Sequence, residues 1–468
     1  MLKKIQVILL YLIFFLLPFN SRYIFNFSNI KHIQSFKGQL EVSFFLFDIF
    51  NILLLLISLW VYRKKFNKVL LGKIIKHPLF YFIIFVILSF WTTKNSFVDW
   101  YNLFRLLSAI SLFLIAQDLL KQYTVLTYAR FILFIDGVLQ AIIALVQFIT
   151  QKSIGFGWLG ESVIGKNILG VAKFSFEGEK YIRAYGTFPH PNVLGIFLLF
   201  SLSAGLSLLL AKKGLFKNIR PRYRFIFYLE LLLILLGIIL TYSRTTITLT
   251  GLVLLIFAFK QRRWINATYK NYCRKLHIPF FLQTTLAILL VFGTVFVTYN
   301  LLTPRLCLRC AGDNSWQLRQ EYQKNAQTII CQHPLFGVGL GKFTSASSKI
   351  TDYGQRPWEL QPVHNLYLLI AAETGLLGLI SFLATIVFYL VKKINLRSLA
   401  DYPLNLFFLS LLLIAFFDHY FWTLPQGQLI FWLALALATV PKTKKIDSPK
   451  YHFEGLLKNV RYLIRELS

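Results

Sequence analysis

The chain has 468 residues, of which 56% are hydrophobic, 17% aromatic and only 15% charged. Its 50 Lys and Arg residues outnumber 19 Asp and Glu residues, which gives a formal net charge of +31. A soluble chain has roughly 25% charged residues, so the composition excludes a soluble nucleic-acid-binding protein, in spite of the positive charge, and a disordered protein. Length and composition predict a polytopic membrane protein.

Long apolar runs follow one another along the chain. A bilayer core of about 30 Å needs roughly 20 mostly apolar residues in a helix, and the sequence then predicts about twelve spans. The first run could be taken for a signal peptide, but no small-residue cleavage site follows it, so we interpret it as a span. The runs are too continuous for a membrane β-barrel, and the predicted fold is an all-α helical bundle. The spans start near Ile5, Ser43, Pro78, Tyr101, Thr127, Pro191, Phe225, Thr245, Pro279, Asn365, Pro403 and Gln428.

One run, residues 225–259, is too long for a single crossing. Residues 241–246 interrupt it with polar side chains, and cations flank both outer ends, at 220–224 and 260–263. Cations at both ends place the two ends on the same side of the membrane. We therefore expect a helical hairpin with Arg244 at its tip.

The distribution of Lys and Arg predicts the orientation. Most of these residues fall in segments on the same side as the N-terminus, which the positive-inside rule assigns to the cytoplasm. Both termini are then cytoplasmic, and two long loops, about 150–188 and about 302–363, lie outside, the second between the ninth and tenth spans. Residues 441–468 form a basic cytoplasmic tail, which either lies on the anionic inner leaflet as an amphipathic helix or is solvated.

Unusual polar residues occur where the outside loops meet the spans. Arg183, His190 and Asn192 precede the sixth span, Arg244 lies at the hairpin tip, and Arg319 and His364 belong to the second long loop. Charged groups at such positions are costly unless they line a cavity or contact a partner. The planar guanidinium binds phosphate oxygens bidentately, so these arginines predict a site for an anionic lipid headgroup.

Five segments contain distinctive combinations of polar, Gly, Pro and aromatic residues. They are 185–192, Ser243-Arg244, 333–343, 364–378 and 418–423. These segments resemble motifs of the O-antigen ligase and polymerase superfamily and occur in the family's order over about residues 180 to 440, whereas residues 1 to 180 match only in hydropathy. We therefore divide the chain into an N-terminal transmembrane region (1–180), a catalytic membrane region (181–440) and the tail (441–468).

The resemblance implies a glycosyltransferase at the outer face of the bacterial cytoplasmic membrane. Such an enzyme moves a glycan from an undecaprenyl diphosphate carrier to an acceptor hydroxyl on a lipid core sugar, a glycan or a protein, without metal or cofactor. Arginines can neutralise the diphosphate leaving group in advance, and we assign this role to Arg183, Arg244 and Arg319. His364 is the expected general base for the acceptor hydroxyl, with inversion at the anomeric carbon.

Simpler structural roles stay open for all of these residues. His364 could bond a backbone carbonyl at a helix start, Arg244 could cap the hairpin, and Arg183 and Arg319 could be solvated cations. Among the weaker candidates, His190 and Asn192 could simply form a rigid entry to the sixth span, since each proline beside His190 disfavours helix at the preceding residue. Asn365 is a further weak candidate.

Three acidic or histidine side chains near the outer face have structural interpretations. Glu373 could pair with an arginine inside the bundle or hydrogen-bond a neighbouring helix. Asp418 and His419 are interpreted as structural residues. The glycines of 337–341 are not a nucleotide-binding loop, because no strand precedes them, and they are expected to shape a tight loop over the site.

The cysteines leave two alternatives. Cys307, Cys310 and Cys331 all lie in the second outside loop, where oxidation is permitted, and they predict one disulfide with a spare thiol. With His333 they could instead form a small structural zinc site.

Two other functions compete with a ligase. A polymerase of the same superfamily would join repeat units of a surface polysaccharide, and it would share these motifs and this topology. A transporter or flippase for a lipid-linked saccharide would need charged residues near the bilayer midplane, where only Asp136 and Glu230 are candidates. The expected partners are therefore the carrier-linked glycan, an acceptor and membrane lipids, and no nucleic acid.

Overall fold

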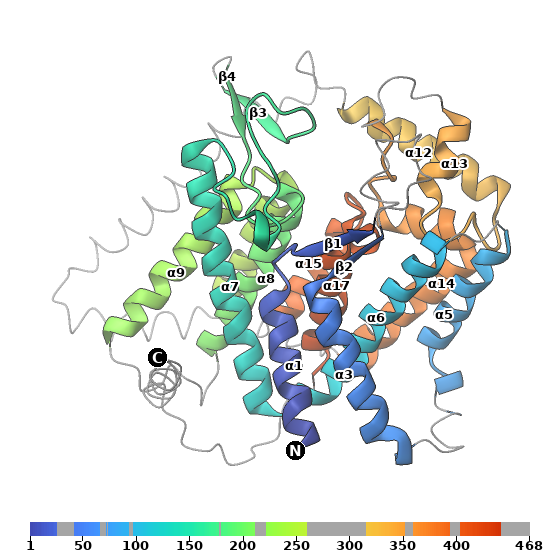
Figure 1. Cartoon of the computed structure of the whole chain (residues 1–468), viewed down its shortest axis with the longest axis horizontal. Helices are drawn as coiled ribbons and strands as arrows, with labels where there is room; N and C mark the ends of the chain where they lie inside the picture. The colour runs from blue at the N-terminus through green and yellow to red at the C-terminus, as the bar shows by residue number, and fades with distance from the viewer. Residues whose placement is uncertain are drawn as a thin grey trace.

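The protein is a bundle of helices (Figure 1), seen here in a computed structural model. The structure describes residues 1–25, 42–65, 72, 74–92, 97–176, 179–210, 221–259, 315–351, 359–393 and 403–440. The predicted span near Pro279, the tail after residue 440, Cys273, Cys307 and Cys310 lie outside the described residues.

Apolar helices make up most of the described chain. Four are long and apolar enough to cross a membrane by length and composition, namely α6 (Phe97–Leu119), α7 (Tyr123–Thr150), α8 (Pro191–Leu210) and most of α14 (Leu366–Lys393). The helical membrane fold is therefore confirmed, whereas the number of twelve spans stays a prediction. The shorter helices of the bundle are α1 (Leu2–Leu16), α3 (Leu46–Tyr62), α5 (Pro78–Leu88), α9 (Pro221–Leu240), Arg244–Phe259, α15 (Pro403–Ile414) and α17 (Pro425–Ala438).

Proline residues begin several of these helices. Pro78, Pro191 and Pro403 are the first residues of α5, α8 and α15, as the sequence predicts. Proline favours this position because its fixed φ suits the helix and its missing N–H would have no helical partner there. The long run 225–259 is broken where expected, because α9 ends at Leu240 and Tyr242 adopts a left-handed φ of 48° before the next helix starts at Arg244.

The helices pack around one large hydrophobic core. α7 contacts α8 and α9, α14 contacts α5, α1 contacts α3, and α6 contacts α17, while α15 packs against both α8 and α17. Helices α15 and α17 therefore connect the α7–α9 side of the bundle with the α5–α6–α14 side (Figure 1).

The expectation of an all-α fold needs one correction, because the described chain also contains two antiparallel hairpins. They consist of β1 (Arg22–Phe25) with β2 (Val42–Phe45), and of β3 (Lys173–Phe176) with β4 (Glu179–Ile182). Each strand has four residues, which is too short to be distinguished by hydropathy from the apolar runs around it.

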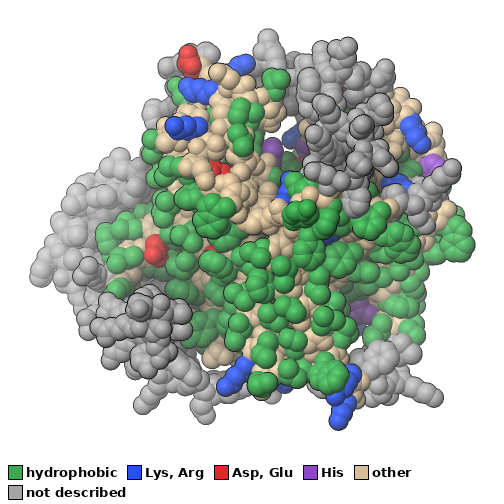
Figure 2. Space-filling view, viewed as in Figure 1, with side chains coloured by type: hydrophobic (Ala, Val, Ile, Leu, Met, Phe, Trp, Pro, Cys, Tyr) green, Lys and Arg blue, Asp and Glu red, His purple; other side chains and the backbone are tan. Residues whose placement is uncertain are grey.

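The two ends of the bundle differ in character. The hairpin β3–β4 and the helices α12 (Ser315–Gln332) and α13 (Phe343–Ile350), which belong to the two long predicted loops, lie at the upper end in Figure 1, and the N-terminus lies at the lower end. Figure 2 shows a belt of apolar side chains between them, with Lys and Arg side chains at both the lower and the upper end. This is the pattern expected of a protein that crosses a bilayer.

Candidate functional site

The segment between β4 and α8 is held firmly by glutamine side chains of α7. Gln147 Oε1 accepts hydrogen bonds from the amides of Tyr185 (3.0 Å) and Gly186 (2.8 Å), and its Nε2 donates to the Gly186 carbonyl (2.9 Å). Gln140 Oε1 accepts from the Thr187 amide at 3.0 Å. A loop with its backbone groups satisfied in this way has a fixed conformation, so Arg183 and His190 at its ends are fixed as well.

Arg183 connects three elements beneath the outer surface. Its side chain is buried, its Nε donates to the Thr241 carbonyl at 2.7 Å, and an Nη donates to Asn192 Oδ1 at 2.6 Å. Thr241 belongs to the turn that presents Arg244, and Asn192 is the second residue of α8. Arg183 thus fixes the turn before Arg244 in relation to the start of α8.

Asp418 extends this network toward the C-terminal helices. Asn192 Nδ2 donates to Asp418 Oδ2 at 3.2 Å, while the other carboxyl oxygen is buried and has no hydrogen-bond partner among the described residues. Burial raises the pKa of Asp418 to about 7, although the charges of Arg319 and Arg183 act in the opposite direction. The carboxyl is therefore close to half-ionised at neutral pH.

His364 lies next to a second histidine. The rings of His364 and His419 meet edge to face with centroids 5.0 Å apart, and Tyr322 of α12 stacks on His364 at 6.0 Å. Burial, together with the charge of Arg319, lowers the pKa of His364 to about 3, while the Pro362 carbonyl acts in the opposite direction. His364 is thus neutral at physiological pH, and its buried Nδ1 has no hydrogen-bond partner among the described residues.

Arg319 lies near this histidine pair although α12 presents it as an exposed residue. Its charge lowers the pKa of His364, of Asp418 and of His419, which places the guanidinium within electrostatic reach of all three. An exposed cation beside a neutral imidazole can bind an incoming anion without displacing a structural ion pair.

His190 belongs to the same centre. Its Nδ1 lies 3.1 Å from the hydroxyl oxygen of Tyr420, and it also receives the Asn192 amide at 3.2 Å. Tyr420 follows His419 directly, and its ring lies 4.9 Å from that histidine. Residues from three sequence regions, 183–192, 319–364 and 418–423, therefore converge on one centre.

The structure gives Asn365 a capping function. Its Oδ1 accepts hydrogen bonds from the amides of Tyr367 and Leu368, both at 3.0 Å, at the start of α14. An N-cap of this kind satisfies amides that have no helical partner. Because α14 begins two residues after His364, this cap also fixes the backbone that carries the imidazole.

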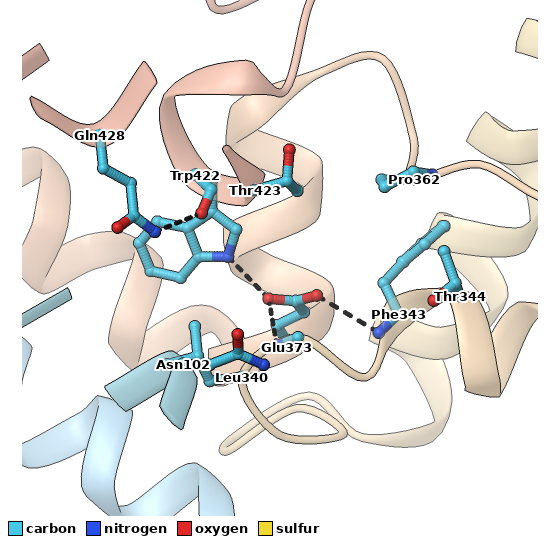
Figure 3. Close-up of a pocket in the computed structure, with 10 residues that line it drawn as sticks. Asn102, Leu340, Phe343, Thr344, Pro362, Glu373, Trp422, Thr423 and Gln428 are labelled. Atoms are coloured by element: carbon cyan, nitrogen blue, oxygen red, sulfur yellow. Dashed lines mark hydrogen bonds between the residues drawn. The ribbon is translucent and has the colours of Figure 1, made fainter. Parts of the chain in front are cut away.

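The glycine segment 337–343 fits into a break in α14, as Figure 3 shows from one side. Gly375 adopts a left-handed φ of 73° inside the helix, and the carbonyls of Ala372 and Glu373 accept the amides of Val338 (3.0 Å) and Gly339 (2.9 Å). The break thus supplies unpaired carbonyls that the loop satisfies. The expected tight loop is present, and Glu373 is part of what holds it.

The Glu373 carboxylate receives three N–H donors in this loop region. Gly341 N lies 2.9 Å away, Phe343 N 3.3 Å and Trp422 Nε1 2.6 Å (Figure 3). No arginine pairs with it among the described residues, so of the two interpretations of Glu373 the hydrogen-bonding one matches the structure.

Arg244 is the first residue of its helix and is half-buried. Its position follows from the Thr241 turn to which Arg183 is bonded. Cys331 lies exposed on α12. Because Cys307 and Cys310 lie outside the described residues, both the disulfide and the zinc site stay predictions. Within the described ranges, no group of three His, Cys, Asp or Glu side chains is arranged to hold a metal ion.

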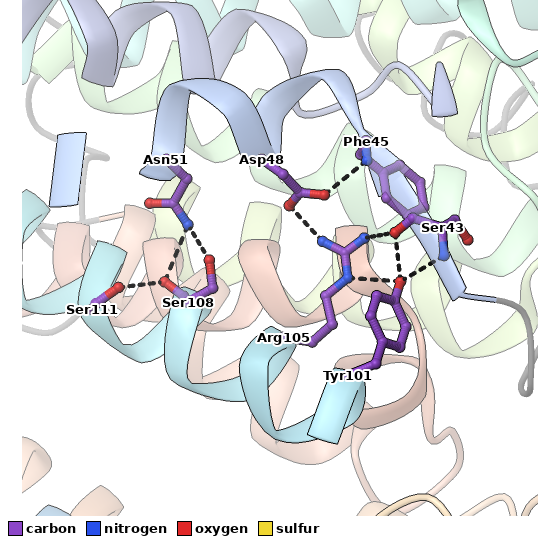
Figure 4. Close-up of polar contacts among 8 residues, drawn as sticks. All are labelled: Ser43, Phe45, Asp48, Asn51, Tyr101, Arg105, Ser108 and Ser111. Atoms are coloured by element: carbon purple, nitrogen blue, oxygen red, sulfur yellow. Dashed lines mark hydrogen bonds and ion pairs between the residues drawn. The ribbon is translucent and has the colours of Figure 1, made fainter. Parts of the chain in front are cut away.

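An ion pair in the N-terminal half was not predicted from the sequence. Arg105 of α6 and Asp48 of α3 form a buried salt bridge under the β1–β2 hairpin (Figure 4). Arg105 also donates to Tyr101 Oη at 2.9 Å and to the Ser43 carbonyl at 3.1 Å, and Asp48 accepts the Phe45 amide at 2.8 Å. The pair is fully hydrogen-bonded and structural, and it fixes α3 against α6.

The sequence analysis interpreted Asp418 and His419 as structural residues. The structure places them among His190, Asn192, Arg319 and His364. The segment Asp418–Thr423 places a carboxyl, an imidazole and a phenol between two apolar helices.

These observations define a helical integral membrane protein with a centre of arginine and histidine side chains at one end of its bundle. Residues 229–383 match the model of a family described as O-antigen ligase. This match covers about a third of the chain, includes Arg244, Arg319, His364 and Glu373, and supports the resemblance to the O-antigen ligase superfamily. No curated protein gives a significant match.

Proposed function

We propose that the protein transfers a glycan from an undecaprenyl diphosphate carrier to an acceptor hydroxyl at the outer face of the cytoplasmic membrane. In this step the bond between the anomeric carbon and the diphosphate oxygen breaks, and a bond to the acceptor oxygen forms on the opposite side. The acceptor proton goes to His364, and undecaprenyl diphosphate leaves with the electron pair of the broken bond.

The observation that supports the proposal is a neutral imidazole with a buried Nδ1 beside an exposed arginine. His364 can accept a proton only if it is unprotonated, and its lowered pKa of about 3 favours the unprotonated form before substrate binds. Burial is the larger cause of that low pKa and the charge of Arg319 the smaller one, so a diphosphate that neutralises Arg319 would raise the pKa of His364 only in part.

In this proposal the three arginines have different roles in binding the diphosphate. Arg319, exposed, and Arg244, half-buried, are accessible to phosphate oxygens, whereas Arg183 contributes its charge from below. The hydrogen bonds of Arg183 to Thr241 and Asn192 position the turn before Arg244. Charges fixed before the reaction stabilise a developing anion without reorganisation.

The decisive experiment is reconstitution with a defined undecaprenyl-diphosphate glycan and candidate acceptors. We expect His364→Ala to lower turnover by about 10²- to 10⁴-fold, the usual contribution of a general base. His333→Ala, which removes an exposed histidine near the end of α12, is the matched control and is expected to retain activity. Full turnover by folded His364→Ala would refute the assignment.

The product pattern separates the related functions. One transfer to a lipid or protein acceptor identifies a ligase, and a ladder of longer carrier-linked chains identifies a polymerase. Carrier movement without a change in bonding would identify a transporter, for which buried Asp136 in α7 and half-buried Glu230 in α9 would be the residues to test.

A further inference from the structure

A pocket lies beside the glycine segment 337–343, which contributes Leu340, Gly341 and Phe343 to its lining. Its empty volume is about 430 Å³, including its mouth. Figure 3 shows side chains from α6, α13, α14 and the 418–428 region around it. The argument rests on six lining residues, Asn102, Thr344, Glu373, Trp422, Thr423 and Gln428.

The Glu373 carboxyl group supplies acceptor oxygens at the wall of this pocket. Its Oε1 receives a single donor, the Phe343 amide at 3.3 Å, whereas Oε2 receives two donors. A carboxyl group has about four acceptor sites when ionised, so Oε1 can accept a further hydrogen bond. A neutral ligand that donates a hydrogen bond fits this site.

The other lining groups are suited to hydroxyls. Asn102 and Gln428 carry amides, and Thr344 and Thr423 carry hydroxyls, so each of these side chains can both donate and accept. Trp422 and Phe343 supply apolar surface beside them. A sugar ring has the matching chemistry, because its hydroxyls donate and accept around the rim while its C–H faces are apolar.

The pocket is connected to the histidine pair by Thr423. The Thr423 hydroxyl lies 2.8 Å from His419 Nδ1, and the His419 ring contacts His364. Pro362, two residues before His364, is another lining residue. A hydroxyl held at this wall would therefore be close to the imidazoles.

We propose that this pocket binds a neutral sugar ring of the acceptor and directs one of its hydroxyls toward His364 and His419. The inference rests on the proposed glycosyl transfer and assigns a subsite to its acceptor. The arginines then hold the diphosphate of the donor while this pocket holds the acceptor.

Binding is tested on the full-length protein in detergent by hydrogen exchange of the peptide that covers 337–344. The probes are methyl glucoside, methyl galactoside and methyl N-acetylglucosaminide, with inorganic pyrophosphate and methylammonium for comparison. We expect at least one of the glycosides to slow exchange there, because the loop amides bond to Glu373 at the pocket wall. Protection of this peptide by pyrophosphate or methylammonium alone, or by none of the probes, would overturn the proposal.

Transfer kinetics provide the second test. Thr344→Val removes a pocket hydroxyl at nearly constant volume, and we expect it to raise the acceptor KM about 10-fold while the donor KM stays unchanged, since one hydrogen bond corresponds to roughly that factor. Thr385→Val is the matched control, because its hydroxyl bonds to the Ser381 carbonyl inside α14 and is not a lining residue.

The two tests separate this inference from the proposed function. Sugar protection of 337–344 in a protein without transferase activity would support the pocket and contradict the reaction. Normal transfer with an unchanged acceptor KM in both Thr344→Val and Asn102→Ala would contradict the pocket and leave the reaction intact. Thermal unfolding of each variant excludes loss of fold as the cause.

Discussion

At the scale of single residues, burial shifts the pKa values of two side chains in the site in opposite directions. It lowers the pKa of His364 to about 3 and raises that of Asp418 to about 7. His364 is then neutral and Asp418 carries only part of a negative charge at neutral pH, so the arginines dominate the charge near the histidine pair. An empty site of this kind is electropositive, which is the condition for attracting a diphosphate.

The pKa of Asp418 predicts how stability depends on pH. Because the pKa rises from an ordinary 3.8 to about 7 on folding, the folded state retains a proton that the unfolded state loses. The contribution of this proton to the free energy of unfolding is fully present below pH 3.8 and is lost as pH rises toward 7. Above pH 7 the free energy of unfolding no longer changes with the titration of Asp418. A shift of about three units corresponds to at most about 4 kcal/mol.

Thermal unfolding of wild type and Asp418→Asn between pH 4 and pH 8 measures this effect. We expect the wild type to lose stability relative to the variant up to about pH 7, after which the difference levels off. His364 contributes with the opposite sign between about pH 3 and its ordinary value of 6.5, so only the difference between the two proteins is informative. A pH-independent difference would show that Asp418 does not titrate as described.

At the scale of elements, the break in α14 is the feature that shapes the site. The left-handed conformation of Gly375 opens the helix, and the loop 337–343 occupies the opening. A Cβ atom on Gly375 would lie only 2.0 Å from the Leu335 carbonyl oxygen. Glycine is therefore required here both for its backbone conformation and for the close approach of the loop.

We expect Gly375→Ala to destabilise the protein by about 1–3 kcal/mol, the usual cost of forcing such a conformation, and to reduce transfer by displacing the loop. Gly251→Ala is the matched control, because Gly251 lies inside the helix Arg244–Phe259 with nothing within 4 Å of its would-be Cβ. Unfolding of both variants in the same detergent measures the contrast. Equal stability of the two variants would contradict the role of the break.

Elements of the fold differ in how far a sequence determines them. Pro78, Pro191 and Pro403 mark helix starts because the local chemistry of proline acts within one turn. The contact of His364 with His419 depends instead on how α14 packs beside the 418–423 segment, and the Asn192–Asp418 bond joins residues 226 positions apart. A single sequence carries no information on such distances. The sequence therefore names candidate residues, such as Arg319 and His364, but it does not predict that Asp418 and His419 lie beside them.

At the scale of the whole molecule, the candidate site and the N-terminus lie at opposite ends of the apolar belt (Figures 1 and 2). Exposed cations at the N-terminal end include Lys3, Lys4, Arg63 and Lys121. The positive-inside rule places that end in the cytoplasm, and the site then faces outward, where a carrier-linked glycan would be presented. This orientation is a prediction, and it can be tested at exposed positions on the two ends of the bundle.

Two exposed positions at opposite ends report this orientation. Cys331 lies exposed on α12 near the site, and Lys121 lies exposed between α6 and α7 at the other end. In a background where the other cysteines are replaced by serine, a membrane-impermeant maleimide added to spheroplasts is expected to label Cys331. Lys121→Cys, with Cys331 also replaced, is expected to react only after the membrane is permeabilised. Labelling of Lys121→Cys in intact spheroplasts, with Cys331 protected, would reverse the orientation and place the transfer reaction on the cytoplasmic side.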